Sequence, residues 1–400
     1  MISVAEARSR ILATAPKPKT EIVMLTEAAG RTLSSSLIAR RTQPPKDMSA
    51  MDGYAVRGED LQTAPTELKV IGEAPAGRPF NGNVGSGETV RIFTGGELPR
   101  GTDTVVLQED TDRIGDIAKF NETQTIGRHV RKAGLDFCTG DTVISSGTIL
   151  TPRHLALAAS INTLWTRVSR RPKVAILATG DEIRLPGDDL GQGQIIGSSG
   201  VGVASYVNQV GGEAVLLDIA GDTEESLIAA AHQAEGADIL VTLGGASVGD
   251  HDLVQQALVK EGLEVDFWKI AMRPGKPLMF GKLREQIVLG LPGNPVSTMV
   301  CAILFLAPLI RFMLGQHQTD PYIVSARLKE AMSANDQRED YVRAKLTQSE
   351  SGFEAEAINI QDSSMMSVFA EANCLIVRPP HMKEAPAGSL VDTLPLDILL

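Results

Sequence analysis

The sequence has few of the features that mark secreted, zinc-binding or membrane-inserted proteins. Its three cysteines are far apart and lack CxxC spacing, so they predict neither a disulfide framework nor a zinc site. The six histidines show no metal-ligand spacing. The longest apolar run, 296–310, falls short of the ~20 residues that span a bilayer, and it predicts a buried helix.

The net charge indicates which partners are unfavourable, and the N-terminal residues indicate the compartment. The formal net charge of -11 repels phosphate backbones and anionic lipid at long range. No basic patch is large enough to overcome it, so we expect neither nucleic acid nor a membrane as a partner. Glu6, Arg8 and Arg10 stand where a signal peptide would need apolar residues. Together with the unpaired cysteines, they predict a cytoplasmic protein.

A chain of 400 residues is longer than the roughly 250 to 300 residues that one hydrophobic core serves, so several domains are expected. Local patterns predict four. A helical linker domain in two pieces, 1–46 and 143–171, would enclose a small inserted β domain, 47–142. An α/β domain, 172–320, and a small C-terminal β domain, 321–400, would follow.

The linker and β domains are predicted from short patterns. Ser3 and Glu6 have the spacing of a capping box at a helix start, and 152–163 has a second helical pattern. Between 47 and 142, brief β-like runs are separated by many glycines and prolines, which is typical of a β domain. Alternating runs resume after Pro321.

The middle of the chain has the pattern of a doubly wound α/β domain. Helix-like stretches separate four apolar or β-branched runs that are typical of parallel strands covered on both faces: 174–178, 214–217, 239–243 and 265–270. Two helix starts are encoded locally. Asp222 with Glu225 forms a predicted capping box. Asn294 followed by Pro295 predicts an N-cap and a first-turn proline.

Four loops follow predicted strands, at the edge where open parallel sheets bind ligands. In the first, 179–182, Thr179 and Gly180 permit close approach to an oxyanion, and the acidic pair after them suits a cation. A simple turn is the alternative. The second, 244–252, places three glycines within six residues at the start of a helix, where amide groups favour phosphate. A tight strand-to-helix turn would use the same glycines.

The other two loops add positive charge and a second helix start. Segment 269–277 gathers three cations and two prolines, which suits an anion site in so acidic a chain, although a surface loop with offset charges is the alternative. Segment 291–297 delivers a helix N-terminus, or simply a well-capped helix start. Four such loops on one edge indicate a phosphate ester or anhydride as ligand. The absence of GxGxxG after the first strand, and of a GxxxxGKS or GxxxxGKT loop, disfavours dinucleotide oxidoreductases and P-loop NTPases.

Six segments together carry a resemblance: SAMDGYAV, RIFTGGELPRGTDTVV, ILATGDEI, TLGGASVGDHD, AMRPGKPL and LPGNPVS. In this order and spacing, the chain closely resembles the bacterial molybdopterin molybdenumtransferase family, also called MoeA, over nearly its whole length. The resemblance implies an elongated homodimer of four-domain subunits, with the α/β domain of one subunit facing the β domain of its partner. It also implies a transferase that inserts molybdate into adenylylated molybdopterin while the phosphoanhydride is cleaved and AMP leaves.

The resemblance, with the chemistry of the loops, assigns roles to single residues. The expected catalytic carboxylates are Asp52, Glu182, Asp222 and Asp252. The last three would hold Mg²⁺ together with the substrate phosphates. The expected substrate-binding residues are Thr94, Asp136, Thr179, Gly180, Gly244, Gly245, Ser247, Arg273, Lys276, Pro292, Asn294, Pro295, Ser297, Arg343 and Ser364. Arg273, Lys276 and Ser297 would form the anion pocket, and Asp52 and Thr94 would complete the partner subunit's site.

One departure and two alternatives stand beside the resemblance. Ser199-Gly200 replaces the Ser-Asn that the family commonly has, which removes an amide that would contact the pterin or cap the next helix. Adenylylation of molybdopterin, or hydrolysis of another nucleotide pyrophosphate, would not need the two β domains. A scaffold role would need the second α/β domain and long linker of animal relatives. A molybdopterin adenylyltransferase and molybdoenzyme-maturation proteins are the expected protein partners.

Overall fold

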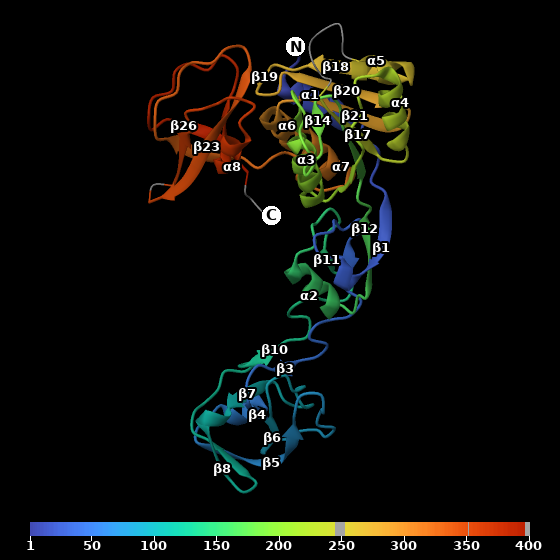
Figure 1. Ribbon diagram of the computed structural model, residues 1–400. Helices are drawn as coiled ribbons and strands as arrows, with labels where there is room; N and C mark the ends of the chain where they lie inside the picture. Colours follow the sequence, from blue (N-terminus) through green and yellow to red (C-terminus); the bar gives the residue numbers. More distant parts are fainter. Residues whose placement is uncertain (245–252, 351, 397–400) are drawn as a thin grey trace. The chain divides into compact units, whose positions relative to one another are not determined.

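The computed structural model describes residues 1–244, 253–350 and 352–396 (Figure 1). The chain divides into two compact units. The first contains Met1–Ser35, Gly147–Thr151 and Trp165–Leu400, and the second contains Ser36–Ser146 and Pro152–Leu164. The first unit therefore holds the α/β domain and the C-terminal strands, and the second holds the inserted β domain.

A six-stranded sheet forms the centre of the first unit. Its order is β16 (Glu213–Leu216), β13 (Lys173–Ala178), β17 (Ile239–Leu243), β21 (Gln286–Leu291), β20 (Pro277–Leu283) and β18 (Leu263–Lys269). The first four strands run parallel, β20 runs antiparallel to β21, and β18 runs antiparallel to β20. The strands predicted at 174–178, 214–217 and 239–243 are confirmed.

The parallel pairing predicted for 265–270 is wrong. The strand exists as β18, but it pairs antiparallel with β20 across a loop of a few residues, which is too short for the crossover that a parallel pair requires. Because β18 lies two antiparallel steps from β21, it points in the same direction as β21. The loop after β18 therefore emerges at the same sheet edge as the loops after β13, β17 and β21.

Both faces of this sheet are buried, which confirms the doubly wound arrangement. Along β13, Val174 and Ile176 pack on one face while Ala175 and Leu177 pack on the other. The first face is covered by α1 (Val4–Ala13), α3 (Ser198–Gln209), α6 (Pro295–Cys301) and α7 (Ala307–Met313) (Figure 1). The second face is covered by α4 (Glu224–Gln233) and α5 (Leu253–Lys260).

Helices α6 and α7 form one long apolar stretch, joined by the π-helical residues Ala302–Leu306. Among the described residues, Pro295–Met313 has the length and apolar composition that could cross a membrane, but 83% of its most apolar window is buried inside the fold. The core helix of a soluble protein passes the same test. The buried helix predicted at 296–310 is confirmed.

Two of the three predicted helix starts differ in detail from the structure. Helix α1 begins as predicted, because the Ser3 hydroxyl accepts a hydrogen bond from the Glu6 amide at 3.1 Å. The N-cap of α4 is Thr223 and not Asp222, since the Thr223 hydroxyl accepts from Ser226 N. Asn294 occupies the N-cap position of α6, but its side chain makes no cap bond.

The C-terminal residues form a second six-stranded sheet with one short strand of the α/β domain. Its order is β19 (Met272–Arg273), β23 (Glu339–Ser349), β24 (Gly352–Ala357), β22 (Val324–Leu328), β26 (Leu390–Pro395) and β25 (Cys374–Arg378), and β25 also pairs with β23. Helix α8 (Met366–Glu371) precedes β25. Since β19 pairs in parallel with Glu339 and Asp340, the C-terminal sheet is hydrogen-bonded directly to the loop after β18.

The second unit is built on a sheet with the order β7 (Thr104–Leu107), β4 (Gly53–Val56), β6 (Glu88–Ile92), β5 (Thr66–Ala74), β9 (Ile117–Phe120) and β8 (Thr111–Ile114). It also contains β2 (Leu37–Ile38) paired with β11 (Thr142–Ile144), β3 (Met48–Ser49) paired with β10 (Val130–Arg131), and α2 (Pro152–Ser160). In the first unit, β1 (Thr20–Met24) pairs with β12 (Trp165–Ser169), and β14 (Ile183–Arg184) pairs with β15 (Ile195–Ile196).

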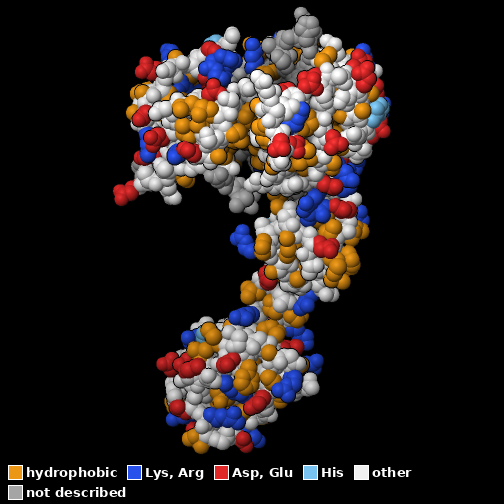
Figure 2. Space-filling model, in the orientation of Figure 1, with side chains coloured by type: hydrophobic (Ala, Val, Ile, Leu, Met, Phe, Trp, Pro, Cys, Tyr) orange, Lys and Arg blue, Asp and Glu red, His pale blue; other side chains and the backbone are white. Residues whose placement is uncertain are grey.

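Charged side chains are mixed over the surface. On the face shown in Figure 2, lysine and arginine side chains are interspersed with aspartate and glutamate. In the second unit, Lys46 pairs with Glu97 and Lys132 pairs with Asp47. On this face, the described residues therefore concentrate neither sign of charge in one broad area.

Candidate active site

Three loops meet at the carboxyl edge of the α/β sheet. The Thr179 amide donates to Leu243 O at 3.3 Å, and the Gly244 amide donates to Leu291 O at 3.2 Å. Gly244 has a φ of 90°, and a Cβ there would lie 3.4 Å from Thr179 O. A Cβ on Gly293 would lie 3.6 Å from the Gly244 Cα. The loops after β13, β17 and β21 therefore pack backbone against backbone, as the glycine pattern predicted.

Gly180 sets the position of the Glu182 carboxylate. Its φ of 138° is a conformation that side-chain-bearing residues rarely adopt. Its amide donates to Ala220 O at 3.1 Å. A Cβ on Gly180 would lie 2.5 Å from a Glu182 carboxylate oxygen, so that carboxylate folds back over the glycine. Thr179, which precedes it, is buried.

Two acidic residues of this edge are linked by hydrogen bonds from the backbone amide of each to the carboxylate of the other. The Asp222 amide donates to Asp181 Oδ1 at 3.1 Å, and the Asp181 amide donates to Asp222 Oδ2 at 3.4 Å. The exchange places Asp181, Glu182 and Asp222 at the ends of two neighbouring strands. Asp181 belongs to the same acidic pair as Glu182 but was not among the expected site residues.

Part of the second loop lies outside the described residues, and with it three of the expected site positions: Gly245, Ser247 and Asp252. Within the described ranges, no group of three His, Cys, Asp or Glu side chains is arranged to hold a metal ion. The set expected for Mg²⁺ is thus represented here by Glu182 and Asp222, both of which are exposed to solvent.

The cations of the third loop have different surroundings. The Arg273 Nη2 donates to Asp336 Oδ2 at 2.6 Å, and its Nε lies 3.7 Å from Asp340 Oδ1. Hydrogen bonds from Arg338 lower the pKa of Asp336 to about 2, and burial raises the pKa of Asp340. Lys276 is exposed and has no ion pair within the part of the chain that the structure describes. Lys276 is therefore the freer of the two for a ligand.

The start of helix α6 is shared with the C-terminal domain. The Val296 amide donates to Ser363 O at 3.1 Å, and Asn294 Nδ2 donates to Ser363 Oγ at 2.9 Å. Pro292 O accepts a 2.5 Å hydrogen bond from the Thr298 hydroxyl. The Val296 amide at this helix start is therefore occupied by a backbone oxygen of the C-terminal domain. Ser297, next along the helix, is 4% exposed.

Arg343 and Ser364 both make hydrogen bonds to Asp362, the residue before Ser363. Arg343 is 2% exposed, and burial lowers its pKa. Its Nη1 donates to Asp362 O at 2.6 Å. The amide and hydroxyl of Ser364 both donate to Asp362 Oδ1, which lowers the pKa of Asp362. The structure thus brings these two residues to the same loop, 361–364, that contacts α6.

Gly200, the departure noted in the sequence, lies in the first turn of helix α3. The N-cap of this helix, Gly197, makes no side-chain cap bond. A Cβ on Gly200 would make ordinary contacts, 3.5 Å from Leu216 Cδ2 and 3.8 Å from Leu243 Cδ1. The backbone therefore has room for the start of a larger side chain at this position.

Three expected site residues belong to the second unit. The amide and hydroxyl of Thr94 donate to Asp52 Oδ1 at 2.6 and 2.8 Å, and these hydrogen bonds lower the pKa of Asp52. Asp52 and Thr94 therefore act as one pair. The Asp136 amide donates to Gln43 O at 3.0 Å. Within the described residues, no hydrogen bond or ion pair joins Asp136 to Asp52 or Thr94.

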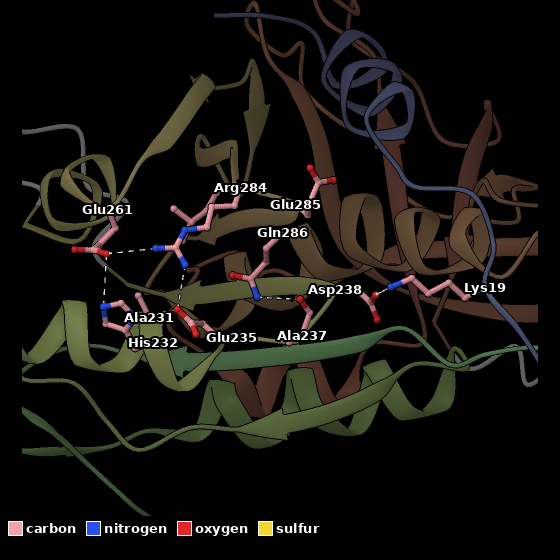
Figure 3. A pocket seen from close by; sticks show the side chains of 12 residues that line it. Lys19, Ala231, His232, Glu235, Ala237, Asp238, Glu261, Arg284, Glu285 and Gln286 are labelled. Atoms are coloured by element: carbon pink, nitrogen blue, oxygen red, sulfur yellow. Dashed lines mark hydrogen bonds and ion pairs between the residues drawn. The ribbon is translucent and has the colours of Figure 1, made fainter.

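A pocket lies at the opposite, amino edge of the sheet, between the ends of α4 and α5 and the turn joining β20 to β21 (Figure 3). Most of its charged side chains pair with one another. Glu235 contacts His232 and Arg284, each at 3.0 Å, and Asp238 accepts from Lys19 at 2.9 Å. None of the residues predicted for the site lines this pocket.

Comparisons with known proteins identify the family. Three family models match in order: the MoeA N-terminal region (domains I and II) over 2–162, a probable molybdopterin binding domain over 175–311, and the MoeA C-terminal region (domain IV) over 325–396. A protein of Haemophilus influenzae named molybdopterin molybdenumtransferase is 38% identical, with all of both chains covered. The chain belongs to the MoeA family.

Other MoeA proteins agree in sequence and in fold. A molybdopterin molybdenumtransferase of Nostoc is 35% identical, with 100% of this chain and 94% of the relative covered. A solved MoeA structure from Pyrococcus horikosii superposes with a TM-score of 0.86 at 30% identity, covering 99% of each chain. The predicted fold of an α/β domain with additional β domains is confirmed. As a MoeA protein, the chain is an enzyme of the transferase class.

Proposed function

We propose that this MoeA protein inserts molybdate into adenylylated molybdopterin, with Mg²⁺-assisted cleavage of the phosphoanhydride. Water is consumed in that cleavage, AMP leaves, and the pterin keeps its terminal phosphate. The observation that carries the proposal is the convergence of three glycine-rich loops, exposed carboxylates and cationic side chains at one edge of the sheet. Such an edge suits a ligand with both a phosphoanhydride and an oxyanion.

The acidic residues would serve the phosphoanhydride. Glu182 and Asp222 are solvent-exposed carboxylates at neighbouring strand ends, which is the hard oxygen donor set that suits Mg²⁺ beside substrate phosphates. Asp252, outside the described residues, belongs to the same proposal. When bound, Mg²⁺ neutralises charge that develops on the pyrophosphate oxygens. Asp181 would hold Asp222 in place through the hydrogen bond to its amide.

The cationic residues would serve molybdate, a tetrahedral dianion that must sit beside the dithiolene thiolates. Lys276, Arg273 and Arg343 come from two domains that are hydrogen-bonded to each other around the start of α6 and along β19. Ser297 and Ser364 add hydroxyl groups there. The proposal includes a cytoplasmic homodimer, in which the Asp52–Thr94 pair completes the partner's site.

The test is AMP release by the purified protein given adenylylated molybdopterin, molybdate and Mg²⁺. We expect release that requires both ions and yields active cofactor, and Asp222→Ala should lose at least about 100-fold of it. Glu285→Ala, an exposed acid on the amino edge, is the matched control and should keep full activity. ATP consumption without added adenylylated pterin would instead support adenylylation. No molybdate-dependent release would contradict the proposal.

A further inference from the structure

Arg343 is a buried cation without a buried anion. It is 2% exposed on strand β23, and no carboxylate forms an ion pair with it within the described residues. An arginine is almost never fully buried unless it is paired, because burial removes the water that solvates its charge. The exposed Asp362 carboxylate attracts Arg343 electrostatically, but its Oδ1 accepts from the amide and hydroxyl of Ser364 and it forms no ion pair with the guanidinium. The hydrogen-bond acceptors that replace water around the guanidinium are therefore uncharged.

That role falls to the neutral side chain of Gln361. Its Oε1 accepts hydrogen bonds from the Arg343 amide at 3.0 Å and from Arg343 Nε at 3.1 Å. Its Nε2 donates to Arg343 O at 3.0 Å and to Ile358 O at 2.6 Å. With Nη1 bound to Asp362 O, Nε and Nη1 are both fixed by uncharged oxygens. Nη2 is the nitrogen for which no acceptor is found within the described residues.

The neighbouring arginine shows the opposite arrangement. Arg273 contacts two carboxylates, Asp336 and Asp340, which offset its charge. No carboxylate forms an ion pair with Arg343 within the described residues, and the amide and carbonyl oxygens that accept from it orient a guanidinium without cancelling its charge. The two arginines therefore differ in their acceptors, which are carboxylates for Arg273 and the neutral amide of Gln361 and a backbone oxygen for Arg343.

We propose that Gln361 is a positioning residue that holds Arg343 ready for an oxyanion without adding a negative charge of its own. The inference rests on the proposed function, in which the oxyanion is molybdate. The place is suitable, because loop 361–364 is bound to the start of α6: Ser363 accepts from the Val296 amide and from Asn294. Gln361 thereby orients a cation of the C-terminal domain beside the α/β site.

The experiment compares Gln361→Glu with Gln361→Met in the full-length protein, using sodium molybdate as the probe in calorimetric titrations. The glutamate keeps an acceptor for Arg343 but adds a charge, whereas methionine keeps the volume and adds none. We expect the dissociation constant for molybdate to rise about threefold in Gln361→Met and at least about tenfold in Gln361→Glu. In the insertion assay, KM for molybdate should rise while kcat changes less than about twofold.

If a thermal melt shows that Gln361→Glu is poorly folded, a double-mutant cycle of Gln361→Met with Arg343→Lys replaces it as the test. Lysine lacks the Nε that Gln361 orients, so Gln361→Met should weaken molybdate binding much less in the Arg343→Lys background than in the wild type. Equal effects in the two backgrounds would overturn the inference, as would Gln361→Glu binding molybdate as tightly as Gln361→Met. If Arg343→Lys binds molybdate more weakly while both Gln361 variants bind normally, the inference fails and the proposed function stands. Absence of molybdate-dependent AMP release by the wild type would mark failure of the proposed function itself.

Discussion

The two edges of the α/β sheet are both rich in charge, but they use it differently. At the amino edge, Lys19, Asp238, Glu235 and Arg284 are paired around an open pocket (Figure 3). At the carboxyl edge, Glu182, Asp222 and Lys276 have no ion pair within the described residues, and glycines bring the loops together. Charged side chains that form ion pairs with one another around a pocket have a structural role. Charged side chains without an ion pair, on glycine-rich loops, are available to bind a ligand.

Among the variants that compare the two edges, Gly180→Ala at the carboxyl edge has the largest expected effect. The added Cβ would lie 2.5 Å from the Glu182 carboxylate, which must swing away because the rest of the loop is held by backbone hydrogen bonds. We expect AMP release to fall by about 100-fold, the scale of misplacing a catalytic group. The φ of 138° should also cost about 1–2 kcal/mol of stability. Rate assays and urea unfolding measure the two effects separately.

Gly236→Ala is the control for this variant at the amino edge. Gly236 also has a positive φ, 86°, and it lines the pocket, but a Cβ there would meet nothing within 4 Å. The stability cost should again be about 1–2 kcal/mol from backbone strain alone. AMP release measured well below the melting temperature should be unchanged. A large loss of activity in this variant would break the distinction between the two edges.

The loops of the carboxyl edge could be predicted from the sequence because their signals are local. Gly180 and Gly244 lie within two residues of the ends of buried strands, and both have the positive φ that only glycine adopts easily. Strand β18 was found, but its partner was not, since pairing direction depends on the length of the next connection. The N-cap of α4 was placed one residue early because Asp222 and Thr223 are both good caps.

The rest of the site depends on contacts between distant parts of the chain. Ser363 occupies the Val296 amide from 67 residues away, and Gln361 reaches Arg343 across two neighbouring segments of the C-terminal domain. No periodicity or motif signals such contacts, so sequence reasoning gave Arg343 a role but not its surroundings. Charges offset by nearby acids were the alternative for the third loop, but Asp336 could not be named as the partner of Arg273 for the same reason.

The second prediction concerns stability at the amino edge. Asp238 accepts hydrogen bonds from Lys19, Arg170 and the Lys173 amide, and its side chain is 7% exposed. Asp238→Asn should destabilise the fold by about 2 kcal/mol, because it leaves Arg170 without its carboxylate. The rate of AMP release at 25 °C should stay within about twofold of the wild type. Urea unfolding and the rate assay together check this, and a selective loss of rate would contradict it.

The pH dependence of the same carboxylate sharpens the second prediction. Burial raises the pKa of Asp238, but hydrogen bonds from Lys173, Lys19 and Arg170 outweigh it, and the net pKa is lowered. A lowered folded pKa means that the stabilisation is complete above the unfolded value of about 3.9 and is lost as pH falls through the folded value. The melting-temperature gap between wild type and Asp238→Asn should therefore be constant from about pH 5 to 7 and should narrow at lower pH. Calorimetry across this range measures it, and a gap that widens in acid would contradict the assignment.

The smallest effect is expected from Arg284→Ala, although its side chain lines the pocket and lies between Glu235 and Glu261 in Figure 3. Arg284 pairs with Glu235 at 3.0 Å and approaches Glu261 at 3.9 Å, but its side chain is 61% exposed. Exposed ion pairs contribute only about 0–1 kcal/mol, and His232 remains beside both glutamates after the change. We expect a loss of at most about 0.5 kcal/mol in urea unfolding and no change in AMP release or molybdate affinity. A substantial drop in either activity would mean that this pocket, and not only the carboxyl edge, takes part in the reaction.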